Sequence, residues 1–320
     1  MTKEGQFVRL FIKRMSTHAD SLYVETFIRG PMDEVWRLTQ TPNLHERWDL
    51  RFTHIEYLLH PDKNQPQRFL YATRIGFGLN IQGEGETIGN RHGPSGERTS
   101  ALKFWSHDLK SLICEGSGYW KYMPSSGGVR FVTGYDYEVR FGRPGQLIDR
   151  LVFRPLMGWA TAWSFDRLRL WIEKGLDPSL ALRLSLIHAL ARLTLAFVWL
   201  YQGLVPKIIS SNLDEIRMLM DAGASSTAAP VALQIVGWIE VSLGVLMLVA
   251  WRARWLFFVN IGLLLLALFG VALNSPGYLA AAFNPVTLNG LMIALSVTGL
   301  LVSTELPSAR NCLRKPKETA

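Results

Sequence analysis

Three charged side chains lie in or beside long apolar runs of the second half of the chain. Glu240 falls in the middle of the run 231–250, where an ionised carboxylate is costly and marks a functional site by default. Arg192 lies at a similar depth, measured from the cytoplasmic ends, and is its expected partner. Lys207 lies at the outer end of the first run. The pattern predicts a polar site inside a membrane. The alternatives are a packing role for Glu240 and snorkelling of Arg192 to the interface.

Two asparagines complete this membrane polar site. Asn284 and Asn289 lie at the outer end of the fourth apolar run, on the side where Lys207 ends the first run. Asn284 precedes Pro285, and an Asn cap followed by Pro is by itself a sufficient structural reason for this sequence at a helix start.

The first half of the chain offers weaker chemistry. Glu84 and Glu86 share a strand face, and His107 precedes Asp108 in a predicted turn. Such groups can act as acid and base when their pKa values are pushed apart, but they are more often surface charges. The sequence has no phosphate-binding glycine motif, no serine elbow and no His/Cys cluster with metal spacing. We assign no catalytic residue and no metal site.

Four apolar segments position the membrane groups. Segment one lies within 184–209, because the uncharged run 193–206 is only about 21 Å long as a helix and the hydrocarbon core is about 30 Å thick. The other segments are 231–250, 256–273 and 286–302. Arginines in the loop 251–255 and the basic residues after Arg310 indicate, by the positive-inside rule, that both termini are cytoplasmic.

The motifs 195–207 (LAFVWLYQGLVPK), 237–244 (GWIEVSLG) and 283–289 (FNPVTLN) resemble the DoxX-like family of four-helix membrane proteins. Some members of that family are linked to quinone-coupled sulfur oxidation or to thiol redox balance. This chain has no cysteine in its apolar segments and no paired histidines for haem. No cofactor is evident, and a bound quinone is the redox carrier that the resemblance leaves open.

The region before the membrane segments predicts an α+β domain. The period-two strand 21–29 is followed by helices at 32–38 and 43–48 and by six more strand candidates between 52 and 141. A long aromatic-rich helix, 146–174, closes the region and should be interrupted at Arg154-Pro155.

This element order resembles the SRPBCC superfamily, also called START-like or polyketide cyclase-like. The resemblance implies a helix-grip fold, in which a curved antiparallel sheet wraps a long C-terminal helix and the space between them holds an apolar ligand. The aromatic side chains that could line such a space are Trp105, Tyr119, Tyr135, Tyr137, Phe141, Trp159 and Phe165. Singly, each is more often a core residue.

Composition separates two unlike halves. Residues 1–180 have 24 Lys and Arg against 20 Asp and Glu, and residues 181–320 have 10 against 6. The positive charges of the first half are spread along the strands, which disfavours nucleic-acid binding. Two cysteines make no disulfide framework. We therefore expect a leader at 1–19, disordered or interfacial, with Met15 an alternative start; a helix-grip domain at 20–175; a four-helix bundle at 184–304; and a basic tail at 305–320.

The sequence thus predicts an inner-membrane protein with four spans. We expect its cytoplasmic domain to bind or sense a lipid- or quinone-like small molecule at the membrane. One alternative is a membrane oxidoreductase subunit that exchanges electrons with quinone; another is a scaffold that recruits a protein partner. The expected partners are membrane lipid and an apolar small molecule, with a homo-oligomer or a membrane partner as further options.

Overall fold

A computed structural model describes residues 21–59, 65–76 and 78–316 of the chain. These residues form two compact units. The first contains the described residues up to Ala181 together with those from Pro307 onward, and the second is Leu182–Leu306. The predicted leader lies outside the described residues.

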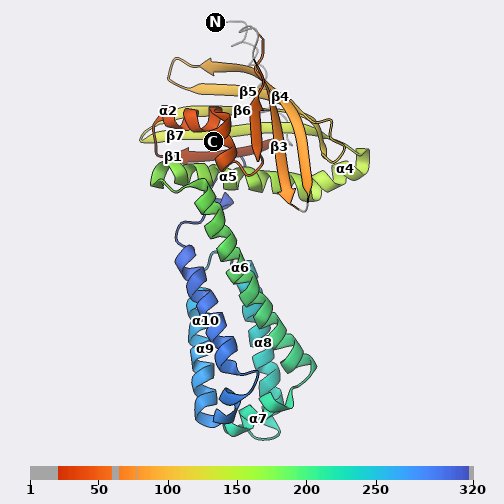
Figure 1. Ribbon diagram of the computed structural model, residues 1–320, viewed down its shortest axis with the longest axis vertical. Coiled ribbons are helices and arrows are strands. Elements are labelled where there is room, and N and C mark those ends of the chain that lie inside the picture. The colour runs from red at the N-terminus through yellow and green to blue at the C-terminus, as the bar shows by residue number, and fades with distance from the viewer. Residues whose placement is uncertain (1–20, 60–64, 77, 317–320) are drawn as a thin grey trace. The chain divides into compact units, whose positions relative to one another are not determined.

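The first unit is built on one antiparallel sheet, whose strands follow the order β1-β7-β6-β5-β4-β3-β2 (Figure 1). Consecutive strands from β2 to β7 pair with each other, and β1 pairs with β7. The strands are β1 (Leu22–Ile28), β2 (His54–Tyr57), β3 (Arg68–Gly76), β4 (Leu79–His92), β5 (Arg98–Trp105), β6 (Ile113–Ser125) and β7 (Gly128–Val139).

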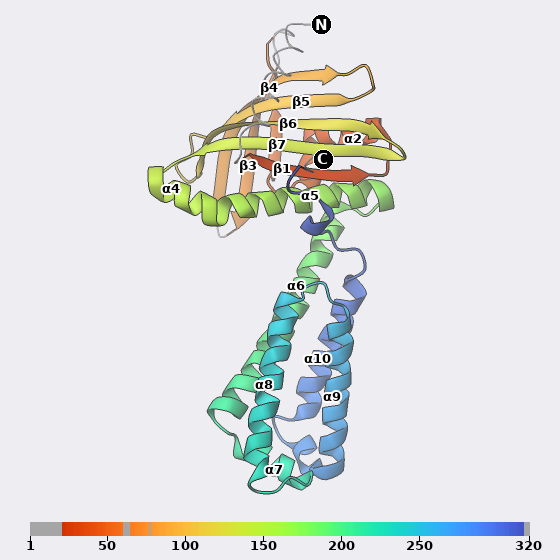
Figure 2. The same cartoon turned by 180° about the vertical axis from the view of Figure 1, so that it is seen from behind.

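Helices complete the helix-grip fold that the sequence predicted. Helices α2 (Met32–Gln40) and α3 (Pro42–Trp48) lie between β1 and β2 in the chain. After β7 the chain continues through α4 (Gly142–Ile148), a π-helical turn η1 (Asp149–Phe153) and the long helix α5 (Arg154–Lys174), which lies along the sheet (Figure 2). The interruption expected at Arg154-Pro155 is this π turn, since Pro155 has no N–H with which to continue the regular ladder.

An aromatic stack joins the sheet to α3 and α5. Phe131 of β7 stacks on Phe165 of α5 with ring centroids 4.4 Å apart. Tyr122 of β6 also stacks on Phe131, with ring centroids 4.9 Å apart. Trp48 of α3 contacts the Phe165 ring, with centroids 6.1 Å apart. These rings are buried, so the interior of the grip is largely filled by its own aromatic side chains.

The C-terminal tail packs on the first unit. Leu313 pairs with Glu25 of the edge strand β1 through two backbone hydrogen bonds of 2.9 Å. The buried carboxylate of Asp166 on α5 accepts hydrogen bonds from the Ser308 N–H and the Asn311 side chain, both at 2.8 Å. The tail therefore covers an otherwise open sheet edge, a common protection against edge-to-edge association.

Four helices, which supply most of the second unit, are long and apolar enough to cross a membrane. They span Pro178–Ile209, Ala228–Val249, Trp255–Asn274 and Pro285–Val302, which confirms the four predicted segments. The first combines α6 (Pro178–Gln202) with a π-helical turn η2 (Gly203–Ile209); the others are α8, α9 and α10. The short helix α7 (Leu213–Asp221) and the 3-10 turn η3 (Pro276–Ala280) lie in the connections.

A buried polar chain crosses the bundle core. The indole N–H of Trp199 donates to Asn260 Oδ1 at 2.6 Å, and Asn260 Nδ2 donates to Ser296 Oγ at 2.6 Å. Apolar side chains such as Leu195, Met247 and Phe257 pack around it. A half-satisfied polar group inside a bundle is costly, so these two hydrogen bonds fix the register of α6, α9 and α10.

The tail contact generates a testable expectation. In Asp166→Ala, Ser308 and Asn311 lose a charged acceptor, and each such hydrogen bond contributes about 1.5–3 kcal/mol. Trypsin should then cleave after Arg310 at least about ten-fold faster in the detergent-solubilised chain, because cleavage follows the population of the open tail. The matched control is Asp33→Ala, which removes an exposed carboxylate. Equal cleavage rates in the two variants would show that Asp166 does not hold the tail.

Candidate functional site

The charged groups of the bundle meet at Lys207. Its ammonium lies 2.9 Å from Glu215 Oε2 and 3.1 Å from Glu240 Oε2, and it donates to the Gln202 carbonyl at 3.4 Å. The Gln202 carbonyl is a hydrogen-bond acceptor, and the two carboxylates are ion-pair partners. The three charged side chains come from η2, α7 and α8 and are 10%, 25% and 15% exposed.

Two glycines bring η2 and α8 together at this point. A Cβ atom added to Gly203 would lie 2.5 Å from the Gly237 carbonyl oxygen, and one added to Gly237 would lie 3.0 Å from the Gly203 carbonyl. Small residues at such contacts let helix backbones approach closely in membranes. The close approach places Lys207 within reach of Glu240, which lies about midway along α8.

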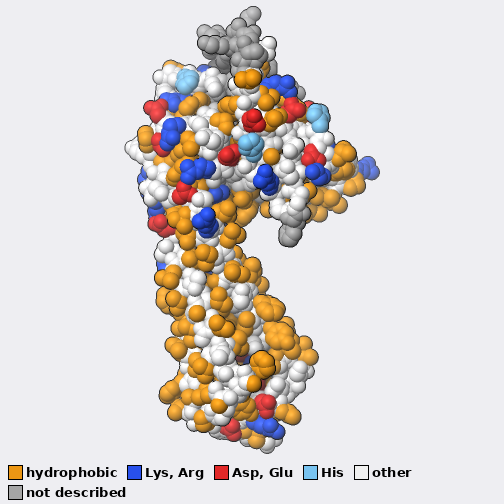
Figure 3. Space-filling view, in the orientation of Figure 1, with side chains coloured by type: hydrophobic (Ala, Val, Ile, Leu, Met, Phe, Trp, Pro, Cys, Tyr) orange, Lys and Arg blue, Asp and Glu red, His pale blue; other side chains and the backbone are white. Residues whose placement is uncertain are grey.

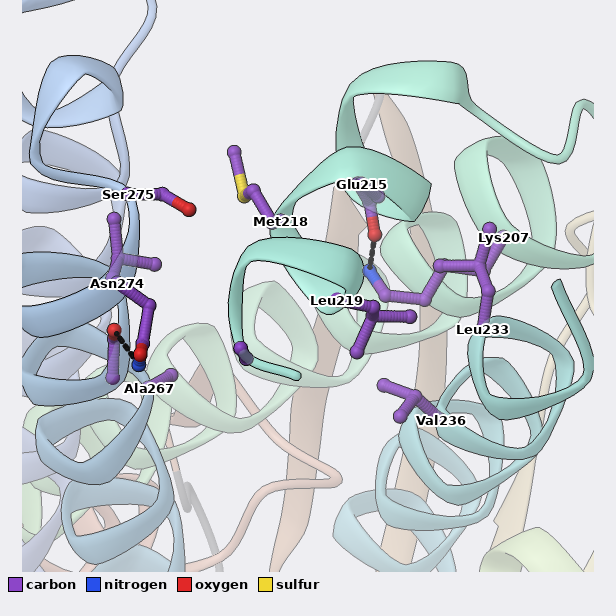
Figure 4. Close-up of a pocket in the computed structure, with 12 residues that line it drawn as sticks. Lys207, Glu215, Met218, Leu219, Leu233, Val236, Ala267, Asn274 and Ser275 are labelled. Carbon is purple, nitrogen blue, oxygen red and sulfur yellow. Dashed lines mark hydrogen bonds and ion pairs between the residues drawn. The ribbon is translucent and has the colours of Figure 1, made fainter. Parts of the chain in front are cut away.

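A cavity of about 230 Å³ lies beside Lys207 and Glu215 (Figure 4). Its walls are mainly apolar and include Leu219, Leu233 and Val236. Figure 4 shows Lys207 and Glu215 pointing toward each other on one side, with Asn274 and Ser275 on the other. Ser275 donates to Asp221 of α7 at 2.7 Å.

A second hollow of about 500 Å³ lies along α8 and α9, and its lining of apolar side chains and Ser242 contains no charged group. Since specific ligand sites combine apolar walls with a few placed polar groups, we take the Lys207 cavity as the candidate site.

Arg192 does not pair with Glu240, so that prediction was wrong. Its guanidinium donates to the carbonyls of Met247, Ala250 and Ala253, and it lies 4.7 Å from the centre of the Phe257 ring. Ala250 follows Glu240 by ten residues, or about 15 Å along a helix. Arg192 instead donates to one carbonyl in the last turn of α8 and to two in the segment that follows it, where a cation is favoured.

The two asparagines have separate places. The Asn284 side chain caps α10 by accepting the Thr287 N–H at 3.0 Å, which is the structural role that the sequence offered as the alternative. Asn289 lies further along α10 and is half-buried. Neither lines the cavity beside Lys207.

Three of the seven aromatic side chains proposed to line the grip lie between the sheet and α5. Phe165 is fully buried in the stack on Phe131. The Tyr135 hydroxyl hydrogen-bonds with Thr161 Oγ1 at 2.8 Å, and the Tyr137 hydroxyl donates to Asp149 at 2.8 Å.

The structure does not bring the other four into this space. Tyr119 pairs with Gly134, and its ring lies over that glycine. Gly134 is next to Tyr135, and successive residues of a strand point to opposite faces of the sheet. Tyr119 is therefore on the face opposite to Tyr135. The Phe104 ring lies over Gly116, which pairs with Tyr137, so Phe104 shares the inner face with Tyr137. Trp105 follows Phe104 in the strand and therefore faces outward. Phe141 and Trp159 are 61% and 42% exposed.

A buried ion cluster that sequence reasoning missed lies inside the grip. Asp49 accepts hydrogen bonds from His45 at 3.0 Å and from Arg51 at 2.9 and 2.7 Å. The Arg51 guanidinium lies over the rings of Phe52 and Tyr135, at 5.5 and 5.4 Å. His45, Asp49 and Arg51 are four and two positions apart around the end of α3, and that spacing is visible in the sequence.

The electrostatics of this cluster favour the ionised pair. Burial alone would raise the pKa of Asp49, but the Arg51 charge and the hydrogen bonds from His45 and Arg51 outweigh it and hold that pKa well below its ordinary value. Burial likewise opposes the charge of Arg51, and Asp49 more than compensates, so the Arg51 pKa is raised.

Glu215 was also missed. It lies in the first turn of α7, which is capped by Asn212, and acidic residues are common there. Nothing in that local pattern indicates that α7 folds back onto Lys207.

The fold and the bundle define a class of protein: a membrane protein with a helix-grip unit and a DoxX-like unit. Residues 196–297 match the DoxX-like family. The uncharacterized membrane protein YndG of Bacillus subtilis (strain 168) is 37% identical over 301 residues, which are 93% of this chain and 98% of YndG. The chain belongs to the same family as YndG.

Solved structures align with the helix-grip unit. They include a STAR-related lipid transfer protein from Xanthomonas axonopodis (16% identical, TM-score 0.37, covering 48% of this chain and 86% of that chain). The hypothetical protein jhp0584 of Helicobacter pylori has the same identity, TM-score and coverage. The di-domain ARO/CYC StfQ is 14% identical, with a TM-score of 0.35 and coverage of 53% and 60%. The fold assignment rests on the strand order of this chain itself.

The glycine contact predicts an asymmetry between helix positions. Gly203→Ala places a methyl group against backbone and should destabilise the bundle by about 1–3 kcal/mol. Gly262→Ala is the matched control, because a Cβ there meets nothing within 4 Å and alanine favours a helix. Thermal unfolding in detergent, followed by tryptophan fluorescence, measures both. Equal melting temperatures would mean that the Gly203–Gly237 contact is unimportant.

The cluster in the grip predicts a pH-dependent stability. Asp49→Asn leaves Arg51 buried without its counter-charge, which should cost about 3–5 kcal/mol. Because folding lowers the Asp49 pKa from its ordinary 3.8, its stabilisation is complete above that value and is lost as pH falls through the folded-state pKa. The difference in free energy of unfolding between the native and variant chains, measured with urea, should therefore be constant above about pH 5 and shrink below about pH 4. A gap that widens in acid would contradict this account.

Proposed function

We propose that this membrane protein binds a lipid- or quinone-like small molecule and that the cavity beside Lys207 holds its polar group. The observation that carries the proposal is an apolar cavity of about 230 Å³ with an ammonium and a carboxylate at one end. Binding sites for small molecules have this composition, apolar walls with a few convergent polar groups.

The cavity volume bounds the ligand. A cavity of about 150 Å³ in another protein is large enough to bind benzene. A volume of about 230 Å³ therefore suits one six-membered ring with small substituents, or a headgroup of that size. A longer apolar tail would have to leave the cavity along the apolar surface of the helices.

The polar end favours a ligand that accepts hydrogen bonds. Lys207 makes ion pairs of 2.9 and 3.1 Å with Glu215 and Glu240, and its hydrogen bond to the Gln202 carbonyl is longer, at 3.4 Å. A ligand carbonyl that replaces this contact leaves both ion pairs in place. A quinone or an ester carbonyl fits that requirement.

The helix-grip domain and both termini belong, in this proposal, on the cytoplasmic side of the inner membrane. The loop between α8 and α9 carries Arg252 and Arg254, whereas the connection 275–284 carries no charge. The tail packs on the same unit from which α6 departs, which supports one side for both. The domain would then receive or sense the ligand beside the bundle.

The same cavity supports the second function, electron exchange with quinone by an oxidoreductase subunit. Reduction of a quinone to a quinol takes up two electrons and two protons. Glu215 and Glu240 lie on either side of one ammonium and are of the type that transfers protons. The electrons would come from a separate donor.

Binding is tested with the full chain in detergent and a short-chain benzoquinone that quenches tryptophan fluorescence. Lys207→Met and Ala267→Phe, which fills the cavity, should each weaken binding at least about ten-fold, equivalent to about 1.4 kcal/mol. Arg217→Gln, which removes an exposed positive charge from α7, should bind as the native chain does. Quenching that is the same in all four proteins would refute the proposed site.

Two further measurements separate the functions. Mass spectrometry of molecules extracted from the purified chain identifies a ligand carried from the cell. Quinone reduction by the native chain that Glu240→Gln abolishes, with stability unchanged, supports the oxidoreductase. Binding without reduction by any donor supports the ligand-binding function alone.

A further inference from the structure

The helix that closes the grip exposes one apolar face at its N-terminal end. Along α4, η1 and the first turns of α5, large apolar side chains are between 42% and 66% exposed: Phe141, Leu147, Ile148, Leu151, Val152, Leu156 and Trp159. Hydrophobic side chains gather over α4 in the space-filling view (Figure 3). In contrast, residues 160–168 of α5 are buried against the sheet.

Such a run is unusual on a water-exposed surface. Single exposed apolar residues are normal, but a contiguous patch marks an interaction site. The spacing of Ile148, Leu151, Val152 and Leu156, at three and four residues, places them on one side of the helix. None of the seven takes part in the aromatic stack on Phe131.

The charges beside this face are basic. Arg143 and Arg150 are exposed, while Asp149, the one acidic residue of α4 and η1, is buried. Asp149 accepts hydrogen bonds from Tyr137 and from Arg154 at 2.8 Å each. Within residues 141–159 the exposed charges are therefore positive, and Gln146 is exposed beside them.

We infer that this face, the apolar surface of residues 141–159, lies on the anionic headgroup layer of the membrane in which the chain is anchored. A helix with an apolar face and flanking arginines inserts that face about 5–10 Å into the headgroup and acyl boundary. Arginines near an anionic surface strengthen that attachment. This inference goes beyond the proposed ligand site and does not depend on it.

Chain connectivity favours lipid over other occupants. The segment 175–177 is all that joins α5, which ends at Lys174, to the first candidate span, which begins at Pro178. Three residues reach about 10 Å when extended. The C-terminal end of α5 is thus tethered to the bilayer, and the face lies about 20–50 Å further along the helix. That tether gives the bilayer an effective concentration at the face that a soluble partner would not match.

Lipid contact is tested with a fluorescent label in nanodiscs of phosphatidylcholine with or without phosphatidylglycerol. The label is placed at Leu151→Cys in a Cys114→Ser background; burial raises the pKa of the remaining Cys312 thiol to about 12, which makes it slow to react. The matched control is Lys103→Cys, an exposed residue on the sheet face that points away from α5. A label at 103 also reports whether the background chain is folded.

We expect lipids with a doxyl group on the upper acyl chain to quench the label at 151 at least about two-fold more than the label at 103. Phosphatidylglycerol should increase that difference, and Arg143→Glu with Arg150→Glu should remove the increase. Equal quenching at the two positions would overturn the inference. So would a label at 151 that is shielded only as protein concentration rises, since a second copy would then cover the face.

Discussion

A charge in the hydrocarbon core must find its partner inside the protein, and the second unit is arranged around that constraint. Lys207 contacts two carboxylates and a carbonyl, and Arg192 contacts three carbonyls in the last turn of α8 and the segment after it. Both sets of contacts require α6 and its π turn to lie against α8 in one register. Gly203 and Gly237 allow that approach. The ion pairs of Lys207 and the packing of η2 on α8 therefore depend on the same glycine contact.

Much of the fold follows from patterns that are local in the chain. Period-two alternation locates the strands, and Pro155 locates the irregular turn before α5. The partner of Glu240 could not be obtained in this way, because depth from the helix ends does not set the register between two helices; the glycine contact does. The faces of Trp105 and Tyr119 depend on register in the same way, since a shift of one residue reverses a side chain's face.

The two units divide polar and aromatic groups differently. In the helix-grip unit, aromatic rings fill the interior around the buried Asp49–Arg51 pair. That pair restricts how the surrounding side chains can pack. In the bundle, apolar walls leave a cavity beside a charged group. The cavity beside charged groups is therefore in the second unit.

The pairing of Leu313 with Glu25 joins β1, the first strand, to a residue 288 positions later in the chain. A ribosome adding about 5–20 residues per second completes that interval in about 15 s to 1 min. During this time the edge of β1 is bare, and the intervening segments have to enter the membrane before the tail emerges. The helix-grip unit therefore completes its β1 edge only after the bundle has been synthesised, although its strands are made first.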